Sequence, residues 1–171
     1  MTVHQVRNGR HILRFEGVVL ASASSQRDDA PRWSELVVYG LANGSYVRSK
    51  IGYSLIAHRA ECPLVDGKME RWLDLDDQTE SRAQRVPCVV CQPVLRAGAL
   101  DPMMMVESTR YTATIARDPA HLAELLTAQQ GRGSHQLPRL VSRVVDQVCA
   151  QDPDFAQYWS SVSAVGVKLT G

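Results

Sequence analysis

The sequence predicts an α+β fold, and three observations support that prediction. The first third is rich in β-branched and aromatic residues and contains a dipeptide that favours a hairpin. Cysteines occur at close spacing in the middle, and the last third has apolar residues at helical spacing. With 171 residues, 44% hydrophobic and 22% charged, the chain has a globular composition and enough length to bury a core.

An antiparallel β-meander is expected in the first third of the chain. The segment from His11 to Ser24 is rich in β-forming residues and predicts a strand that could break near Gly17. Small and polar residues up to Pro31 then predict a loop. Apolar and aromatic residues recur from Trp33 to Leu41, which predicts the second strand.

The dipeptide Asn43-Gly44 predicts a tight hairpin turn directly after that strand. Both central residues of the favoured two-residue turn take positive φ, a conformation that suits Asn and Gly. A third strand is expected from Tyr46 to about His58, with Gly52 as a bulge or bend.

The middle of the chain gives weaker patterns. Residues from Met69 to Leu75 are compatible with a strand or a short helix, and Asp76 to Arg85 is expected to be a loop or an exposed helical turn. Further along, Met103 to Ile115 predicts one or two strands.

Helices are expected at the end of the chain. Asp118-Pro119 and Asp152-Pro153 each combine an N-cap residue with a proline at the first helical position. The first helix is expected to end at Gly131, and another to start at Pro138. Their apolar stripes are Leu122, Leu125 and Leu126; Leu140, Val141, Val144, Val145 and Val148; and Phe155, Tyr158 and Trp159. We expect a β-rich α+β domain over residues 1–131 and a helical pair over residues 132–171 that packs on it.

His58, Cys62, Cys88 and Cys91 form the pattern H-x3-C, a gap of 25 residues, and C-x2-C. Zn²⁺ prefers four such ligands in a tetrahedron, and a C-x2-C turn can direct both thiolates to one ion. In a reducing compartment this pattern favours a metal over a disulfide. The sequence therefore predicts a central zinc knuckle with a structural Zn²⁺ ion. The alternatives are a catalytic zinc, and unmetallated thiols or a disulfide.

An enzymatic alternative rests on the segment Pro87-Cys88-Val89-Val90-Cys91. It resembles the P-C-x-x-C half of the zinc deaminase signature, whose upstream H-x-E or C-x-E motif supplies a glutamate proton shuttle. Here Glu61 would take that role, but the upstream motif is H-x-x-E, and one extra residue turns a helical carboxylate by about 100°. Cys62 would also fill the coordination position that a catalytic zinc leaves open.

A broader resemblance covers roughly residues 33–126. The stretch from Trp33 to Cys62, the C-x2-C pair and the strand-like segment Val106 to Tyr111 are similar to a group of small uncharacterised actinobacterial and mobile-element proteins. The resemblance implies a zinc-binding role for the same four residues. It implies no activity.

The net charge of +1 gives no global field that would drive the chain onto nucleic acid or membrane. Residues 1–60 are nevertheless mildly basic, with eight Lys and Arg against four Asp and Glu. Arg14, Tyr46, Arg48 and Lys50 are candidates for a nucleic-acid contact on a sheet face, since Tyr46, Arg48 and Lys50 alternate along one strand.

No apolar run approaches the about 20 residues of a membrane span, and the start of the chain lacks the apolar stretch of a signal peptide. We therefore expect a cytoplasmic protein without a membrane partner. Its expected function is that of a non-enzymatic, zinc-stabilised binding module for a protein or nucleic-acid partner. The resemblance suggests an accessory role in a phage or mobile element. The alternative is a deaminase-like zinc hydrolase.

Overall fold

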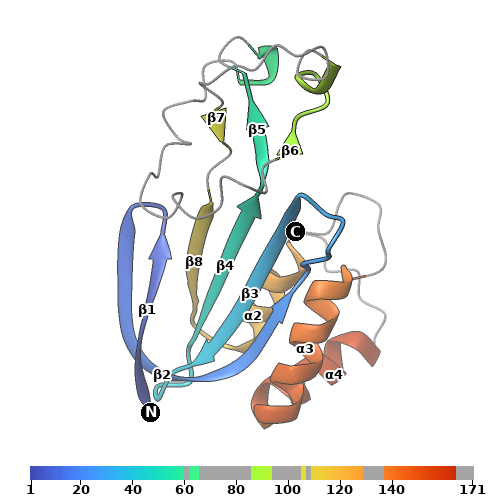
Figure 1. The fold of residues 1–171 in the computed structure, drawn as a ribbon. Helices are drawn as coiled ribbons and strands as arrows, with labels where there is room; N and C mark the ends of the chain where they lie inside the picture. Colours follow the sequence, from blue (N-terminus) through green and yellow to red (C-terminus); the bar gives the residue numbers. More distant parts are fainter. Residues whose placement is uncertain (60–61, 66–85, 94–104, 107–108, 129–136, 165–171) are drawn as a thin grey trace. The chain divides into compact units, whose positions relative to one another are not determined.

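A computed structural model describes residues 1–59, 62–65, 86–93, 105–106, 109–128 and 137–164 (Figure 1). Antiparallel strands come first and helices come last, which confirms the predicted α+β class. The chain divides into two compact units. The first comprises residues 1–25, 34–51 and 111–171, and the second comprises residues 26–33 and 52–110.

A five-stranded sheet has the order β1-β2-β3-β4-β8. Its strands are β1 (Thr2–Asn8), β2 (His11–Ser24), β3 (Arg32–Gly40), β4 (Tyr46–Ser54) and β8 (Arg110–Ala116). Strand β1 is an addition to the predicted meander. Asn8 pairs with His11, so the turn between β1 and β2 consists of Gly9 and Arg10, and Gly9 takes a positive φ of +58° at its first position.

Strand β2 is long and curved, so that its two halves pair with different partners (Figure 1). The first half pairs with β1 up to Gly17, and the second half pairs with β3 from Val18 onward. The predicted break near Gly17 is thus a bend in a continuous strand. A Cβ atom at Gly17 would lie 2.7 Å from the carbonyl oxygen of Gly40, so only glycine permits this close approach.

The hairpin between β3 and β4 differs in one detail from the expected turn. The amide of Leu41 donates to the carbonyl of Ser45 at 2.9 Å, which leaves a three-residue loop. Gly44 has φ of +79°, whereas no described residue other than glycine has a positive φ. The loop is therefore of the kind that ends in a glycine bulge, because a single left-handed residue is enough to restore the strand pairing.

The predicted third strand is wrong in its length. Strand β4 ends at Ser54, and the chain continues as β5 (Ile56–His58), which belongs to a second, three-stranded sheet. The Ser54 hydroxyl accepts a hydrogen bond from the amide of Ile56 at 3.2 Å, and the amide of Leu55 donates to the carbonyl of Pro31 at 2.8 Å. The bond between Leu55 and Pro31 keeps the register of the bond between Leu41 and Ser45, so it is the last rung of the β3–β4 ladder. Pro31 has no N–H to donate in return, so the ladder stops there and Gly52 is not the point of interruption.

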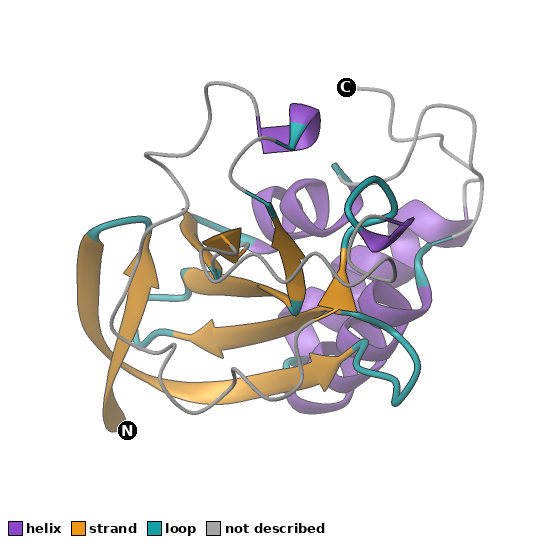
Figure 2. Cartoon of the chain, turned by 45° about the horizontal axis from the view of Figure 1, so that its top comes forward, coloured by secondary structure: helices purple, strands orange, loops and turns teal. Residues whose placement is uncertain are grey.

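Three helices cover one face of the five-stranded sheet (Figure 2). They are α2 (Pro119–Thr127), α3 (Arg139–Gln151) and α4 (Pro153–Ala164). The two predicted N-caps are confirmed, because Asp118 accepts from the amide of His121 at 2.8 Å and Asp152 accepts from the amide of Phe155 at 3.0 Å. Helix α2 ends before Gly131, which lies outside the described residues.

Apolar side chains fill both faces of this sheet. On the helix-covered face, Leu36 and Val38 of β3 pack with the buried stripes of the helices and with Phe155. On the opposite face, Val6, Val47 and Ala113 form a smaller cluster. The sheet curls around that cluster, since the amide of Gly9 donates to the carbonyl of Tyr111 at 2.9 Å and thereby joins the β1–β2 turn to β8.

No helix in the described ranges has both the length and the apolar character of a membrane span.

The second sheet has the order β6-β5-β7, with β6 at Val86–Pro87 and β7 at Met105–Val106. Strand β5 pairs in parallel with β6 and antiparallel with β7. A short 3-10 helix, η1, spans Pro63–Val65. The segments expected at Met69–Leu75 and Asp76–Arg85 lie outside the described residues. The expected strand region after Met103 contains two strands, β7 and β8.

Candidate metal centre

The parallel pairing of β5 with β6 brings two of the predicted ligands to one edge. Ala57 pairs with Pro87, so His58 and Cys88 are the next residues along the two strands. The amide of Cys88 continues the pairing by donating to the carbonyl of Ala57 at 2.9 Å. Parallel strands place their carboxyl ends on the same side, and the ligands that follow them therefore meet.

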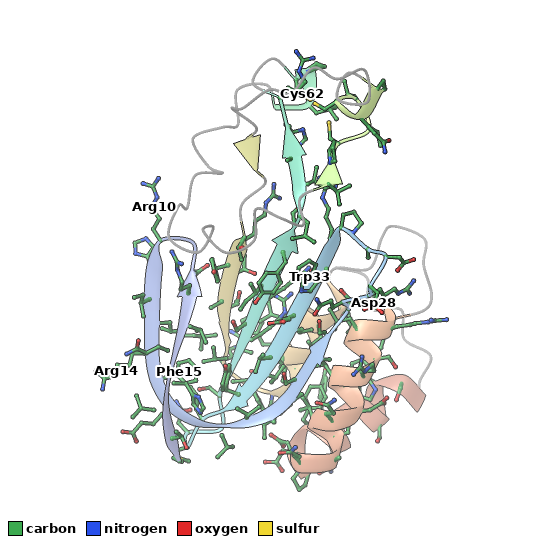
Figure 3. The ribbon with its side chains drawn as sticks, viewed as in Figure 1. Arg10, Arg14, Phe15, Asp28, Trp33 and Cys62 are labelled. Atoms are coloured by element: carbon green, nitrogen blue, oxygen red, sulfur yellow. The ribbon has the colours of Figure 1, made fainter. Side chains whose placement is uncertain are left out.

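Cys62 reaches the same place through a tight turn after β5. Its amide donates to the carbonyl of Arg59 at 3.0 Å, which folds the chain back toward His58. Figure 3 shows Cys62 beyond the end of β5, in the second unit. The H-x3-C spacing thus works through a turn, and no helix is needed to bring the two side chains together.

Three of the four predicted ligands form a tight set. The ligand atoms of His58, Cys62 and Cys88 all lie within 4.8 Å of one another. The Sγ of Cys62 lies 3.5 Å from Nδ1 of His58 and 3.7 Å from the Sγ of Cys88. A disulfide needs a sulfur separation of about 2.05 Å, so the cysteines are free thiols.

These separations are those of a tetrahedral metal site. Bond lengths of about 2.3 Å to sulfur and about 2.0 Å to nitrogen place two sulfur ligands about 3.8 Å apart. They place a sulfur and a nitrogen ligand about 3.5 Å apart. The two distances at Cys62 match those edges without any movement of the side chains. The set can therefore hold a metal ion.

Cys91 is not part of the group within 4.8 Å, but the C-x2-C turn brings it beside that group. The amides of Cys91 and Gln92 both donate to the carbonyl of Cys88, at 3.0 and 2.9 Å, and so close the turn. The thiol of Cys91 interacts with the thiols of Cys88 and Cys62, and its Sγ accepts a hydrogen bond from the amide of Arg59 at 3.3 Å. A backbone donor to a thiolate is a common outer-shell partner at metal sites.

The cluster is closed to solvent. Exposed fractions are 4% for His58, 6% for Cys62, 5% for Cys88 and 2% for Cys91. Burial raises the pKa of the Cys91 thiol to about 11. Burial also acts to raise the pKa of Cys88, but hydrogen bonds from the amides of Cys91 and Val90 and from the neighbouring thiols outweigh it and lower that pKa to about 7.

The candidate nucleic-acid residues do not form one open surface. Tyr46 is 3% exposed and Arg48 is 7% exposed, on the sheet face that the helices cover. The Tyr46 hydroxyl donates to the Asp152 carboxylate at 2.8 Å, so its ring cannot stack on a base. Arg14 is exposed and points away from β2 (Figure 3). Strand alternation correctly grouped Tyr46 with Arg48, but it does not tell which face is covered.

Glu61, the proton shuttle of the enzymatic alternative, lies outside the described residues. The Arg59 amide that bonds to Cys91 was not predicted from the sequence. Every residue other than proline has a backbone N–H, so residue type gives no indication of such a donor.

No protein-family model, curated protein or solved structure matches the chain significantly. The resemblance to small actinobacterial and mobile-element proteins therefore stays a prediction from the sequence.

Proposed function

We propose that His58, Cys62, Cys88 and Cys91 bind a structural Zn²⁺ ion, and that the protein is a non-enzymatic, zinc-stabilised binding module. The supporting observation is the match between the Cys62 distances and the edges of a tetrahedral zinc site. The donor set of three thiols and one imidazole suits zinc, which binds soft and borderline ligands in that geometry.

A structural role fits the composition of the buried cluster in the described part of the second unit. Among the described residues, the buried cluster there comprises the three cysteines with Ile56 packed against them. Structural zinc in small modules contributes on the order of 10 kcal/mol, comparable with the net stability of a whole domain. The ion would thus add stability at the cluster formed by the described residues of this unit.

The surface beside the centre supports a binding role. Val89 and Val90, the two residues between the C-x2-C cysteines, are 79% and 42% exposed, and Leu64 of η1 is 55% exposed. Apolar side chains held outward on a rigid metal-bound turn lose little conformational entropy on binding. We infer that this tip, defined by Leu64, Val89 and Val90, contacts the partner, and its apolar character favours a protein over a nucleic acid.

The binding role is tested by chemical crosslinking in cells that produce the tagged full chain. We expect the native protein to yield a defined crosslinked partner, and Val89→Ser combined with Val90→Ser to lose it while keeping its zinc. Val18→Ser, which changes a valine 45% exposed on β2, is the matched control and should keep the partner. If the tip variant and the control gave the same crosslinks, the tip would have no role in binding.

The deaminase-like alternative makes a different prediction for Glu61. An enzyme of that kind needs an open position on the zinc for water, whereas four protein ligands fill the tetrahedron. Glu61→Gln is therefore expected to leave zinc content and partner binding unchanged. Deamination of a nucleoside or nucleobase by the native protein, abolished by Glu61→Gln with zinc retained, would favour the enzyme instead. An accessory role in a phage or mobile element remains part of the proposal through the sequence resemblance alone.

A further inference from the structure

Two of the proposed zinc ligands are also placed to form a disulfide. The Sγ atoms of Cys62 and Cys88 lie 3.7 Å apart, and both residues are buried free thiols. A disulfide needs a separation of about 2.05 Å, so the two sulfurs have to approach by only about 1.7 Å. They lie on separate turns, one after β5 and one after β6, and a bond between them would join the two turns.

Cys91 is held in a different way from Cys62. Its Sγ accepts a hydrogen bond from the amide of Arg59 at 3.3 Å, and it lies outside the group whose ligand atoms are all within 4.8 Å of one another. The Cys62 sulfur has an imidazole and a thiol as its neighbours, and no backbone amide of the described residues donates to it. Cys62 can therefore move toward Cys88 without losing a backbone hydrogen bond, which favours it as the partner of Cys88.

We propose that the cluster is a peroxide-responsive switch, in which oxidation joins Cys62 to Cys88 and releases the ion. The inference rests on the proposed zinc site. One thiolate attacks a peroxide oxygen, the O–O bond breaks, hydroxide leaves and a sulfenic acid forms. The second thiolate attacks the sulfenic sulfur, the S–O bond breaks and a second hydroxide leaves. The two sulfurs thus give two electrons to hydrogen peroxide, and two protons convert both hydroxides into water.

The disulfide removes half of the coordination. His58 and Cys91 remain, and two protein ligands hold zinc far more weakly than four. The two turns that become joined also carry the exposed apolar residues of the tip, so oxidation acts on the surface that we infer to contact the partner. A thiol reductant reverses the disulfide by exchange and restores both thiolates.

Burial restricts which oxidants can reach the sulfurs. Cys62 is 6% exposed and Cys88 is 5% exposed. Hydrogen peroxide is small and uncharged, whereas oxidised glutathione has to bring a sulfur of its own into line with the attacking thiolate. We therefore expect hydrogen peroxide to release zinc at least ten times faster than oxidised glutathione at equal concentration.

The test uses the full chain purified with its zinc under reducing conditions. Each oxidant is added in the presence of a coloured zinc indicator, and the protein is then digested and analysed by mass spectrometry without reduction. Trypsin places Cys62 in the peptide 60–68, and both Cys88 and Cys91 in the peptide 86–96. We expect hydrogen peroxide to release about one zinc ion per chain. The two peptides should become joined through Cys88, and dithiothreitol with added zinc should restore the native zinc content.

Cys149→Ser is the matched control, because that thiol lies in α3, outside the cluster, and the variant should respond as the native chain does. A protein that contains zinc but keeps it in hydrogen peroxide would overturn the switch alone. So would a disulfide confined to the peptide 86–96, or equal release by both oxidants. A native chain that lacks zinc at the outset would overturn both the switch and the zinc site on which it rests.

Discussion

The backbone amide of Arg59 donates a hydrogen bond of 3.3 Å to the Sγ of Cys91 and joins the two halves of the candidate metal centre. Arg59 directly follows His58 at the end of β5, and Cys91 closes the C-x2-C turn. The bond is strongest when the sulfur is a metal-bound thiolate, since a charged acceptor roughly doubles the strength of a hydrogen bond.

Removing the metal is therefore expected to expose the Arg59 amide. In the metal-bound protein this amide should exchange slowly with solvent, and a zinc chelator should speed its exchange at least 100-fold. The amide of Val148 in α3 is the control, because the apolar core of the first unit contains no metal ligand. Hydrogen exchange followed by mass spectrometry or NMR provides the measurement. Equal rates with and without chelator would contradict the expected coupling of metal and fold.

Tyr46→Phe is expected to lower the free energy of unfolding by about 2 kcal/mol, because it removes a donor from a carboxylate. The lost bond of 2.8 Å joins β4 to Asp152, the cap of α4. Urea unfolding provides the measurement. Tyr158→Phe, in a ring that is partly buried against the same core, should cost much less. A similar loss in both variants would mean that the Tyr46–Asp152 bond adds no stability.

Gly17→Ala is expected to destabilise the protein by about 2 kcal/mol or more, because the new Cβ would approach a backbone oxygen that cannot rotate away. That oxygen, on Gly40, would be 2.7 Å from the Cβ. Gly52→Ala is the matched control, since its Cβ would meet its nearest neighbour at an ordinary 3.8 Å. Thermal unfolding of both variants provides the comparison, and a neutral Gly17→Ala would show that β2 bends without need of glycine.

Asp118 gives α2 a cap whose contribution depends on pH. The hydrogen bond from the His121 amide, with help from the charge of Arg117, lowers the pKa of Asp118 below its usual value. A carboxyl whose pKa is lower in the folded state contributes stability that is present above the unfolded value of about 3.9. That contribution is lost as the pH falls through the folded value.

Asp118→Asn should therefore flatten the acid side of the stability profile. We expect it to be less stable than the native chain at pH 7 and to converge with it as the pH falls through the lowered pKa of Asp118 in the folded state. Asp118→Ser, a second neutral cap, should give the same flattening. Unfolding by urea at several pH values provides the measurement. A constant difference between native and variant over this range would exclude a role for the Asp118 charge.

Local patterns predicted the parts of the molecule that depend on neighbouring residues. The Asp118 and Asp152 caps follow from residue types at fixed positions, and the C-x2-C turn follows from its spacing. The closeness of His58, Cys62 and Cys88 was predictable for the same reason. His58 and Cys62 are close in sequence, and only one parallel strand pair is needed to bring Cys88 beside them.

Features that depend on distant packing were not predictable in this way. The chain passes from one sheet to the other at Leu55, whose amide donates to the carbonyl of Pro31 and whose carbonyl accepts from the amide of Val86 at 2.9 Å. Nothing in the residue type of Leu55 indicates that bond. The burial of Arg48 depends likewise on what covers its face of the sheet. Strand β1 could have been predicted from the sequence, because Asn8-Gly9 is the same dipeptide that predicted the later hairpin.

The central claim is that the His58, Cys62, Cys88 and Cys91 cluster binds zinc, and the metal content of the purified full chain tests it most directly. Elemental analysis should find about one zinc ion per chain in the native protein and almost none in Cys88→Ser. Cys149→Ser should keep the native content, because Cys149 lies in α3, outside the cluster. Native protein without zinc, or equal zinc in the native chain and Cys88→Ser, would contradict the claim.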